Sequence, residues 1–265
     1  MCCHSASLFS EEQIVSMIPD NDETIEDLQL DGLQLIQKKN AFRFGMDSVL
    51  LAHFANIRES DTVADFGTGN GVLLFLLKGR KKGKRYYAFE IQEEAAELAE
   101  RNVRLNRLED SMTVIHADAR DALEYIQPCS VDAVICNPPY GQPGAVLASP
   151  RESKSIARNQ KEDTLDRMLK GAFSILKGRG KFILVYPASQ MFSIMTKLRS
   201  HHLEPKVFQL AYPYIHKPAN LVLIEAVKDA RPTLHTRPPL IIYNQDGSLT
   251  NELKSVYHIQ EQTEF

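Results

Sequence analysis

A glycine-rich turn between two apolar segments is the feature that most constrains how this chain can fold. The short apolar segment 62–66 runs into the turn Gly67-Thr68-Gly69-Asn70-Gly71, and the apolar run 72–77 follows directly. Glycine adopts backbone conformations that other residues avoid, and it lets a ligand approach the main chain closely. A strand, a glycine turn and a helix in this order predict a ligand-binding unit of an α/β fold.

The spacing of the glycines narrows the kind of ligand. A dinucleotide-binding turn has the pattern Gly-x-Gly-x-x-Gly, which would place its third glycine at position 72. Here the third glycine is Gly71, and Val72 occupies the next position. Because a side chain at that position hinders the close packing that a pyrophosphate requires, the turn favours a ligand without a pyrophosphate.

Apolar strand-like segments alternate with helix-like segments along most of the chain. The predicted strands are 62–66, 86–90, 112–116, 131–136, 181–186, 205–211 and 219–227, and the predicted helices are 47–57, 70–79, 93–106, 119–126, 162–176 and 188–200. Such alternation predicts a doubly wound, mostly parallel sheet of seven strands with helices on both faces. The last two strands have no helix between them, which predicts an antiparallel pair at one edge. The alternating stretch 27–37 around Asp-Gly predicts an N-terminal hairpin.

The same periodicity divides the chain into four parts. Residues 1–20 have little periodicity and are expected to form a disordered tail, and Met17 is an alternative start. Residues 21–60, the hairpin and first helix, form an N-terminal extension packed on the core. Residues 61–228 form the main α/β domain, and the proline-containing residues 229–265 form a C-terminal extension.

Acidic residues stand at the ends of the next two strands. Glu90 follows the second strand about 20 residues after the glycine turn, where a carboxylate accepts hydrogen bonds from ribose hydroxyls. Asp118 follows the third strand, where an acid can accept from an adenine amino group. A glycine turn with these two acids predicts an adenosine pocket without phosphates, which suits S-adenosylmethionine. The predicted cofactor-binding residues are Asp65, Gly67, Thr68, Gly69, Gly71, Glu90, Ile91, Asp118, Ala119 and Asn137.

The fourth strand ends in the tetrapeptide Asn137-Pro138-Pro139-Tyr140. Nothing in this cluster titrates near neutral pH, so it is poorly suited to acid–base chemistry. The Asn137 side-chain oxygen and the Pro138 carbonyl can each accept one hydrogen of a planar amine. Tyr140 can stack on the flat group that carries the amine. These four residues are therefore the predicted catalytic residues.

Taken together, the loop from Asp65 to Gly71, Glu90, Asp118 and the tetrapeptide resemble the class I amino-methyltransferases, which have a Rossmann-like sheet. The wider sequence is similar to the bacterial tRNA1(Val) adenine-37 N6-methyltransferases. The similar segments are 42–52, 90–92 with Asn102 and Asn106, Arg151, Ala157-Arg158, Pro205 and 238–243. The resemblance implies transfer of a methyl group from S-adenosylmethionine to N6 of adenine 37 in a valine tRNA.

Three other functions remain compatible with the tetrapeptide. A protein glutamine amide, as in the release-factor methyltransferases, presents the same –NH2 geometry as an adenine. The N2 amine of a guanine in ribosomal RNA is a close variant of the same substrate. The alternative from a different class is a non-catalytic module that binds S-adenosylmethionine and RNA.

The bulk composition sets limits on partners. The formal net charge is −3, so an RNA substrate must be recognised by local basic patches. The expected RNA contacts are Arg43, Arg151, Lys154 and Arg158. No run of about 18 apolar residues and no secretory signal occur, and the four cysteines lack Cys-x-x-Cys spacing. We therefore expect a reduced, cytoplasmic, metal-free protein without membrane contact, and a monomer.

Overall fold

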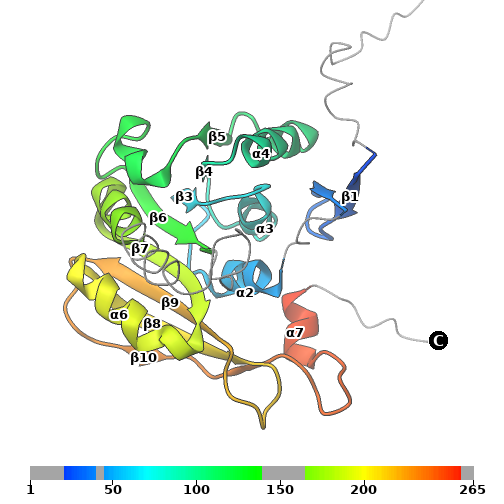
Figure 1. The fold of residues 1–265 in the computed structure, drawn as a ribbon, viewed down its shortest axis with the longest axis vertical. Coiled ribbons are helices and arrows are strands. Elements are labelled where there is room, and N and C mark those ends of the chain that lie inside the picture. Colours follow the sequence, from blue (N-terminus) through cyan, green and yellow to red (C-terminus); the bar gives the residue numbers. More distant parts are fainter. Residues whose placement is uncertain (1–20, 40–44, 139–164, 258–265) are drawn as a thin grey trace, which may run out of the picture.

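The computed structural model describes residues 21–39, 45–138 and 165–257, arranged around one large twisted sheet (Figure 1). Its strands are β3 (Thr62–Phe66), β4 (Arg85–Glu90), β5 (Met112–His116), β6 (Val131–Cys136), β7 (Leu176–Pro187), β8 (Leu203–Tyr212), β9 (Leu221–Lys228), β10 (His235–Thr236) and β11 (Leu240–Ile241). The order across the sheet is β10-β8-β9-β7-β6-β3-β4-β5, and β11 also pairs with β8. The seven predicted strands are all present, and the sheet contains two further short strands, β10 and β11.

The strand directions are those expected of a doubly wound sheet. In the order β5-β4-β3-β6-β7, each strand pairs in parallel with the next. β9 runs antiparallel to both β7 and β8, so the predicted antiparallel pair near one edge is confirmed. A crossover connection returns a parallel strand to the same edge of the sheet. The carboxyl ends of β3, β4, β5 and β6 therefore lie along one edge.

Helices cover both faces of this sheet. One face carries α2 (Met46–Phe54), α3 (Val72–Gly79), α4 (Glu93–Leu105) and α7 (Asn251–Val256). The other carries the 3₁₀ segments η1 (Ala119–Glu124) and η2 (Ala188–Gln190), a helix over 165–175, and α6 (Met191–Ser200).

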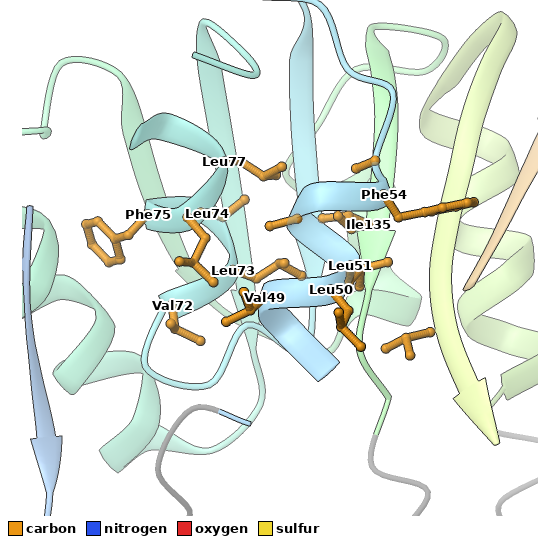
Figure 2. Packing of buried hydrophobic residues seen from close by; sticks show 14 of the residues in the cluster. Val49, Leu50, Leu51, Phe54, Val72, Leu73, Leu74, Phe75, Leu77 and Ile135 are labelled. Atoms are coloured by element: carbon orange, nitrogen blue, oxygen red, sulfur yellow. The ribbon is translucent and has the colours of Figure 1, made fainter. Parts of the chain in front are cut away.

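Successive strand residues contribute to opposite cores. Ile183 lies in the core under α2 and α3, whereas its neighbour Phe182 lies in the core under α6. This alternation follows from the two-residue period of a strand, and it explains why these strands are almost wholly apolar. Figure 2 shows the first core, in which side chains of α2 and α3 meet over the sheet beside Ile135 of β6.

Several boundaries differ from the expected ones. The N-terminal hairpin consists of β1 (Glu23–Asp27) and β2 (Gln34–Lys38), so its connection is longer than the Asp-Gly turn alone suggested. In place of the predicted helix 119–126 the structure has the 3₁₀ segment η1, which is kinked at Asp121, where the dihedral angles are non-helical (φ −99°, ψ 21°). β7 begins at Leu176, and its register against β6 shifts between Val131 and Ala133.

The C-terminal part of the described chain is more structured than the sequence suggested. β10 and β11 add to the outer side of β8, and α7 packs against β11 and α2. The apolar side chains of Leu240, Ile242, Leu253 and Val256 are buried in the core shared with α2. Among the described residues, no helix is both long enough and apolar enough to cross a membrane.

Candidate functional site

A cavity of about 560 Å³ opens at the carboxyl edge of the sheet. Its volume lies within the range of pockets that hold small ligands and cofactors. It is lined by residues of β2, α2 and its N-cap, β3, the glycine turn, the start of α3, α4 and its N-cap, and the residue after β6. These residues are Gln37, Lys38, Gly45, Ser48, Asp65, Gly67, Thr68, Gly69, Asn70, Val72, Leu73, Gln92, Glu94, Ala95, Leu98 and Asn137. The predicted glycine turn and the predicted Asn137 therefore share one cavity.

The glycine turn needs its glycines for two different reasons. Gly67 and Gly69 have positive φ angles of 78° and 58°, and a Cβ atom on either would meet nothing within 4 Å. Gly71 also has a positive φ, 88°, but a Cβ there would lie 2.9 Å from the Phe75 ring. Gly71 thus allows α3 to pack, while the open space beside Gly67 and Gly69 leaves their main chain accessible to a ligand.

Asp65 is a buried acid with one unsatisfied oxygen. Its Oδ2 accepts a hydrogen bond of 2.7 Å from the Thr68 hydroxyl, whereas its buried Oδ1 has no partner among the residues that the structure describes. Burial raises the pKa of Asp65 to about 7; the Thr68 hydrogen bond lowers the pKa and the nearby Glu90 charge raises it. A buried carboxylate oxygen without a partner is costly, so this atom is suited to meet a cationic or hydrogen-bonding group of a ligand.

Glu90 holds the glycine turn in place. Its Oε2 accepts from the Gly69 amide at 2.8 Å, and its Oε1 accepts from the Gln92 amide at 2.9 Å. The side chain is buried and is not among the residues that line the described cavity. The carboxylate therefore supports the wall of the cavity, and each oxygen keeps a second lone pair that can accept from a ribose.

Asp118 lies at the end of β5, where it caps η1. Its side chain accepts hydrogen bonds from the Arg120 backbone amide at 2.9 Å and from Arg120 Nε at 2.6 Å. Burial opposes ionisation of Asp118, but these Arg120 interactions hold its pKa below the ordinary value of an aspartate. Asp118 does not line the described cavity, and a contact with an adenine would have to share its oxygens with Arg120.

Asn137 projects from the end of β6 into the cavity wall. Its Nδ2 donates to the hydroxyl of Ser48 in α2 at 3.1 Å, although the two residues are 89 positions apart. Ser48 was not among the predicted site residues; the only signal for it was its place in the similar segment 42–52.

The hairpin forms a further wall that sequence reasoning did not find. Asn102 of α4 accepts from the Ile36 amide at 2.6 Å and donates to the Ile36 carbonyl at 3.1 Å and the Asn70 carbonyl at 3.0 Å. One helix turn on, Asn106 makes the same pair of bonds with the main chain of Gln34 at 2.8 and 2.7 Å. The two amides bind the free edge of β2 as a neighbouring strand would, and they bring Gln37 and Lys38 to the cavity.

The remaining predicted residues have different positions. Ile91 is exposed and Ala119 is buried, and neither lines the described cavity. Pro138 is partly buried beside Asn137. Pro139, Tyr140, Arg43, Arg151, Lys154 and Arg158 lie outside the described residues. Within the described ranges, no group of three or more His, Cys, Asp or Glu side chains could hold a metal ion.

Comparison with known proteins connects this geometry to a family. The sequence profile of the methyltransferase small domain family matches residues 44–204. The tRNA1(Val) (adenine(37)-N6)-methyltransferase of Aliivibrio salmonicida is 31% identical over 214 residues, which span 80% of this chain and 88% of that protein. The protein of the same name from Bacteroides thetaiotaomicron is 32% identical over 166 residues, 62% of this chain and 68% of that protein.

Solved structures show the same fold at low sequence identity. A predicted O-methyltransferase from Agrobacterium tumefaciens superimposes with a TM-score of 0.64 at 23% identity, covering 80% of this chain and 96% of that chain. The M. jannaschii protein TYW2, crystallised in complex with AdoMet, superimposes with a TM-score of 0.53 at 18% identity, covering 79% and 87% of the two chains.

Proposed function

The chain belongs to the methyltransferase small domain family and, within it, to the tRNA1(Val) (adenine(37)-N6)-methyltransferases, and we propose that it methylates N6 of adenine 37 in a valine tRNA. The observation that carries the proposal is that Asn137 and the glycine turn line one cavity. An acceptor for a planar amine and a cradle for a small ligand therefore border the same cavity.

S-adenosylmethionine is the methyl donor, and the residues present fit it. The unpartnered Asp65 Oδ1 suits the ammonium of its methionine part, and the open main chain at Gly67 and Gly69 admits the ligand closely. Glu90 and Asp118 remain the proposed acceptors for the ribose hydroxyls and the adenine amine. Its sulfonium supplies an electrophilic methyl group and leaves as a neutral thioether, which is an excellent leaving group. The protein therefore has mainly to orient the reactants and bring them together.

Asn137 and Pro138 prepare the nucleophile. An exocyclic adenine amine is a poor nucleophile because its lone pair is delocalised into the ring. Asn137 Oδ1 and the Pro138 carbonyl accept its two hydrogens and turn the lone pair out of the ring plane. The new N–C bond forms as the S–C bond breaks, the sulfur keeps the bonding electrons, and the amine then loses one proton to water. No residue of the site has to act as a general base.

A tRNA anticodon loop suits this site because the target base must leave its stack. An unpaired loop base is partly exposed, so its extrusion costs only a few kcal/mol. With a net charge of −3, the protein must bind the phosphates through local basic segments. The proposed phosphate contacts are Arg43, Arg151, Lys154 and Arg158. The affinity for RNA should fall steeply as the salt concentration rises. We propose that the reaction takes place in the cytoplasm, where a tRNA substrate would be found, and that a monomer performs it.

The site is formed by residues from two of the proposed parts of the chain, on either side of the boundary between residues 60 and 61. We propose that residues 61–228 form the catalytic domain and that residues 21–60 and 229–265 are extensions packed on it. The cavity draws Gln37, Lys38, Gly45 and Ser48 from the N-terminal extension. This supports a role for that extension in completing the site rather than only in covering the core.

The decisive experiment is methyl transfer by the purified protein from labelled S-adenosylmethionine to three acceptors: unmodified tRNA, ribosomal RNA and a release factor. Label in tRNA, recovered as N6-methyladenosine at position 37, is the expected result. Asn137→Ala should lose transfer while it still binds S-adenosylmethionine. Label in the release factor alone, or in ribosomal guanine, would replace the tRNA assignment, and binding without transfer to any acceptor would favour a non-catalytic module.

A further inference from the structure

The contact between Ser48 and Asn137 ties the proposed catalytic amide to a helix far away in sequence. The Asn137 amide nitrogen donates to the Ser48 hydroxyl at 3.1 Å, both residues line the cavity, and Ser48 is only 5% exposed. Few water molecules can reach such a hydroxyl, so the contact is not readily exchanged for one with solvent.

The helix that carries Ser48 is held at its C-terminal end by a side chain from outside the helix. In its first turn the Ser48 amide donates to the Gly45 carbonyl at 3.1 Å. At its C-terminal end Lys82 Nζ donates to the carbonyls of Ala52, His53 and Ala55 at 2.7–2.8 Å. The Lys82 bonds occupy carbonyls that the C-terminal end of a helix leaves without partners, so this end of α2 cannot readily shift.

Apolar packing holds the same helix against the sheet. Val49, Leu50, Leu51 and Phe54 are at most 2% exposed, and Figure 2 shows them around α2, with Val49 next to the side chains of α3. Close packing of this kind keeps the helix in place, because its side chains cannot move without opening a void. The Ser48 hydroxyl is therefore presented to Asn137 from a rigid support.

An asparagine amide needs such a support to act on an amine. The last side-chain torsion of asparagine has a broad range, and a half-turn about this bond exchanges the positions of the amide oxygen and nitrogen. A hydroxyl can either donate or accept a hydrogen bond. The bond to Ser48 therefore fixes the plane of the amide, but it does not decide whether Oδ1 or Nδ2 faces Ser48. The substrate amine decides the orientation of the amide, because only Oδ1 can accept the amine hydrogen. Nδ2 then faces Ser48 and donates to its hydroxyl.

We propose that Ser48 is a positioning residue for methyl transfer: by accepting the Nδ2 hydrogen of Asn137, it holds Oδ1 toward the target amine. This inference rests on the proposed function, since it assumes that Asn137 receives the amine. Ser48 itself touches neither reacting atom in this scheme.

The first test separates kcat from binding. Ser48→Ala should lower kcat about 10-fold, corresponding to loss of a hydrogen bond of about 1.4 kcal/mol. Its Kd for S-adenosylmethionine and its KM for tRNA should stay within about twofold of wild type. Ser48→Thr keeps the hydroxyl and should recover most of kcat, and thermal melting of both variants checks that α2 remains folded.

A second measurement does not depend on the substrate. In nitrogen-15 NMR spectra, the Asn137 side-chain amide is identified as the pair of signals that disappears in Asn137→Ala. In Ser48→Ala these signals should shift from their wild-type positions and exchange faster with water. Ser174→Ala, at a surface hydroxyl of the helix over 165–175 that donates to the Lys170 carbonyl, is a matched control that should leave them unchanged.

Two results would overturn the proposal. One is a Ser48→Ala enzyme with wild-type kcat and unchanged Asn137 signals. The other is a loss of S-adenosylmethionine affinity as large as the loss of kcat, which would make Ser48 a cofactor contact. If the wild-type protein methylates another amine instead of tRNA, the proposed target is wrong, but the same kcat comparison on that amine and the NMR spectra still decide the role of Ser48.

Discussion

Asp65 combines burial, an unsatisfied oxygen and a displaced pKa at one residue. A normal aspartate ionises near pH 4, but burial raises the pKa of Asp65 to about 7 in the protein without a ligand. Between these two pH values the folded protein keeps a proton on Asp65 that the unfolded chain has lost. Stability therefore falls as the pH rises from about 4 to 7, and above pH 7 the cost stays constant.

Asp65→Asn should remove this dependence. The asparagine is neutral at every pH, so the variant should gain stability over wild type as the pH rises, by on the order of a few kcal/mol at pH 8. Urea unfolding of both proteins without ligand at pH 5 and pH 8 measures the difference. A difference that does not change with pH would show that Asp65 is ionised in the free protein.

The same residue links cofactor binding to protons. If the ammonium of S-adenosylmethionine meets Asp65 Oδ1, binding favours the ionised carboxylate and releases a proton from Asp65 below about pH 7. Calorimetry at pH 6.5 in two buffers with different ionisation enthalpies should show proton release in wild type. Asp65→Asn should show less release, and equal release in both proteins would exclude Asp65 as its source.

Glu90 has a structural and a proposed binding role that one substitution can separate. Glu90→Ala removes the acceptor of the Gly69 and Gln92 amides, so it should lower the melting temperature even without ligand. It should also weaken S-adenosylmethionine binding by about 1–3 kcal/mol, measured by calorimetry. A lower melting temperature with unchanged affinity would leave Glu90 as a support of the turn and remove its proposed ribose contact.

At the scale of elements, the β1–β2 hairpin is held by side chains rather than by a neighbouring strand. Asn102 of α4 and Asn106, which directly follows that helix, bind the main chain of β2, and Arg101 pairs with the buried Glu23 of β1 at 2.7 Å. In Figure 1 the hairpin stands beside α4 and α3 and apart from the large sheet. Leucines of the hairpin, among them Leu30 and Leu35, are also buried in the core shared with α3, so polar contacts and apolar packing together set its position and with it one wall of the cavity.

Asn102→Ala should therefore affect both the hairpin and the site. Asn102 is fully buried and bonds to Ile36 and to Asn70 of the glycine turn, so its loss should cost about 1–3 kcal/mol and weaken S-adenosylmethionine binding. Urea unfolding, calorimetry and the rate of proteolytic cleavage in residues 23–38 measure these effects. Asn106→Ala is the control, because Asn106 has no contact with the turn; it should loosen the hairpin with little change in affinity. Equal losses of affinity in both variants would contradict the proposed link.

At the scale of the whole molecule, the segment after β9 belongs to the core. Arg237 donates to the Phe54 carbonyl at 3.0 Å, and Arg80 donates to the Val256 carbonyl at 2.7 Å, so both ends of this segment are tied to the helices of one face. Leu240, Ile242, Leu253 and Val256 fill that core.

A chain ending at Lys228 should not fold cooperatively. It loses four buried aliphatic side chains, each worth about 1.5–3 kcal/mol, and a small domain is stable by only about 5–15 kcal/mol. A chain ending at Tyr257 keeps all four and serves as the control. Far-ultraviolet circular dichroism during heating should show a sharp transition for the control and none for the shorter chain. A sharp transition in both would mean that residues 229–257 are dispensable for folding.

The sequence by itself determined what depends on neighbouring residues. Strand and helix periodicity predicted the seven main strands and their alternation with helices, because the period of apolar residues is a local property. The glycine turn was predictable because Gly67, Gly69 and Gly71 need positive φ angles. Asn137 could be placed beside the turn, because parallel strands bring their carboxyl ends to one edge.

Only the tertiary structure decided which groups these residues meet. Ser48 reaches Asn137 across 89 positions, and Asn102 reaches Ile36 across 66, so no local pattern could reveal either contact. The sequence showed Glu90 and Asp118 as acids at strand ends, but the structure shows that backbone amides and Arg120 already bind them. β10 and β11 consist of two residues each, too short for a periodic signal, and they form only because β8 offers them an edge. Hydrogen bonds and burial between distant segments depend on the folded path of the chain, and that path fixes the pKa of Asp65 and the shape of the cavity.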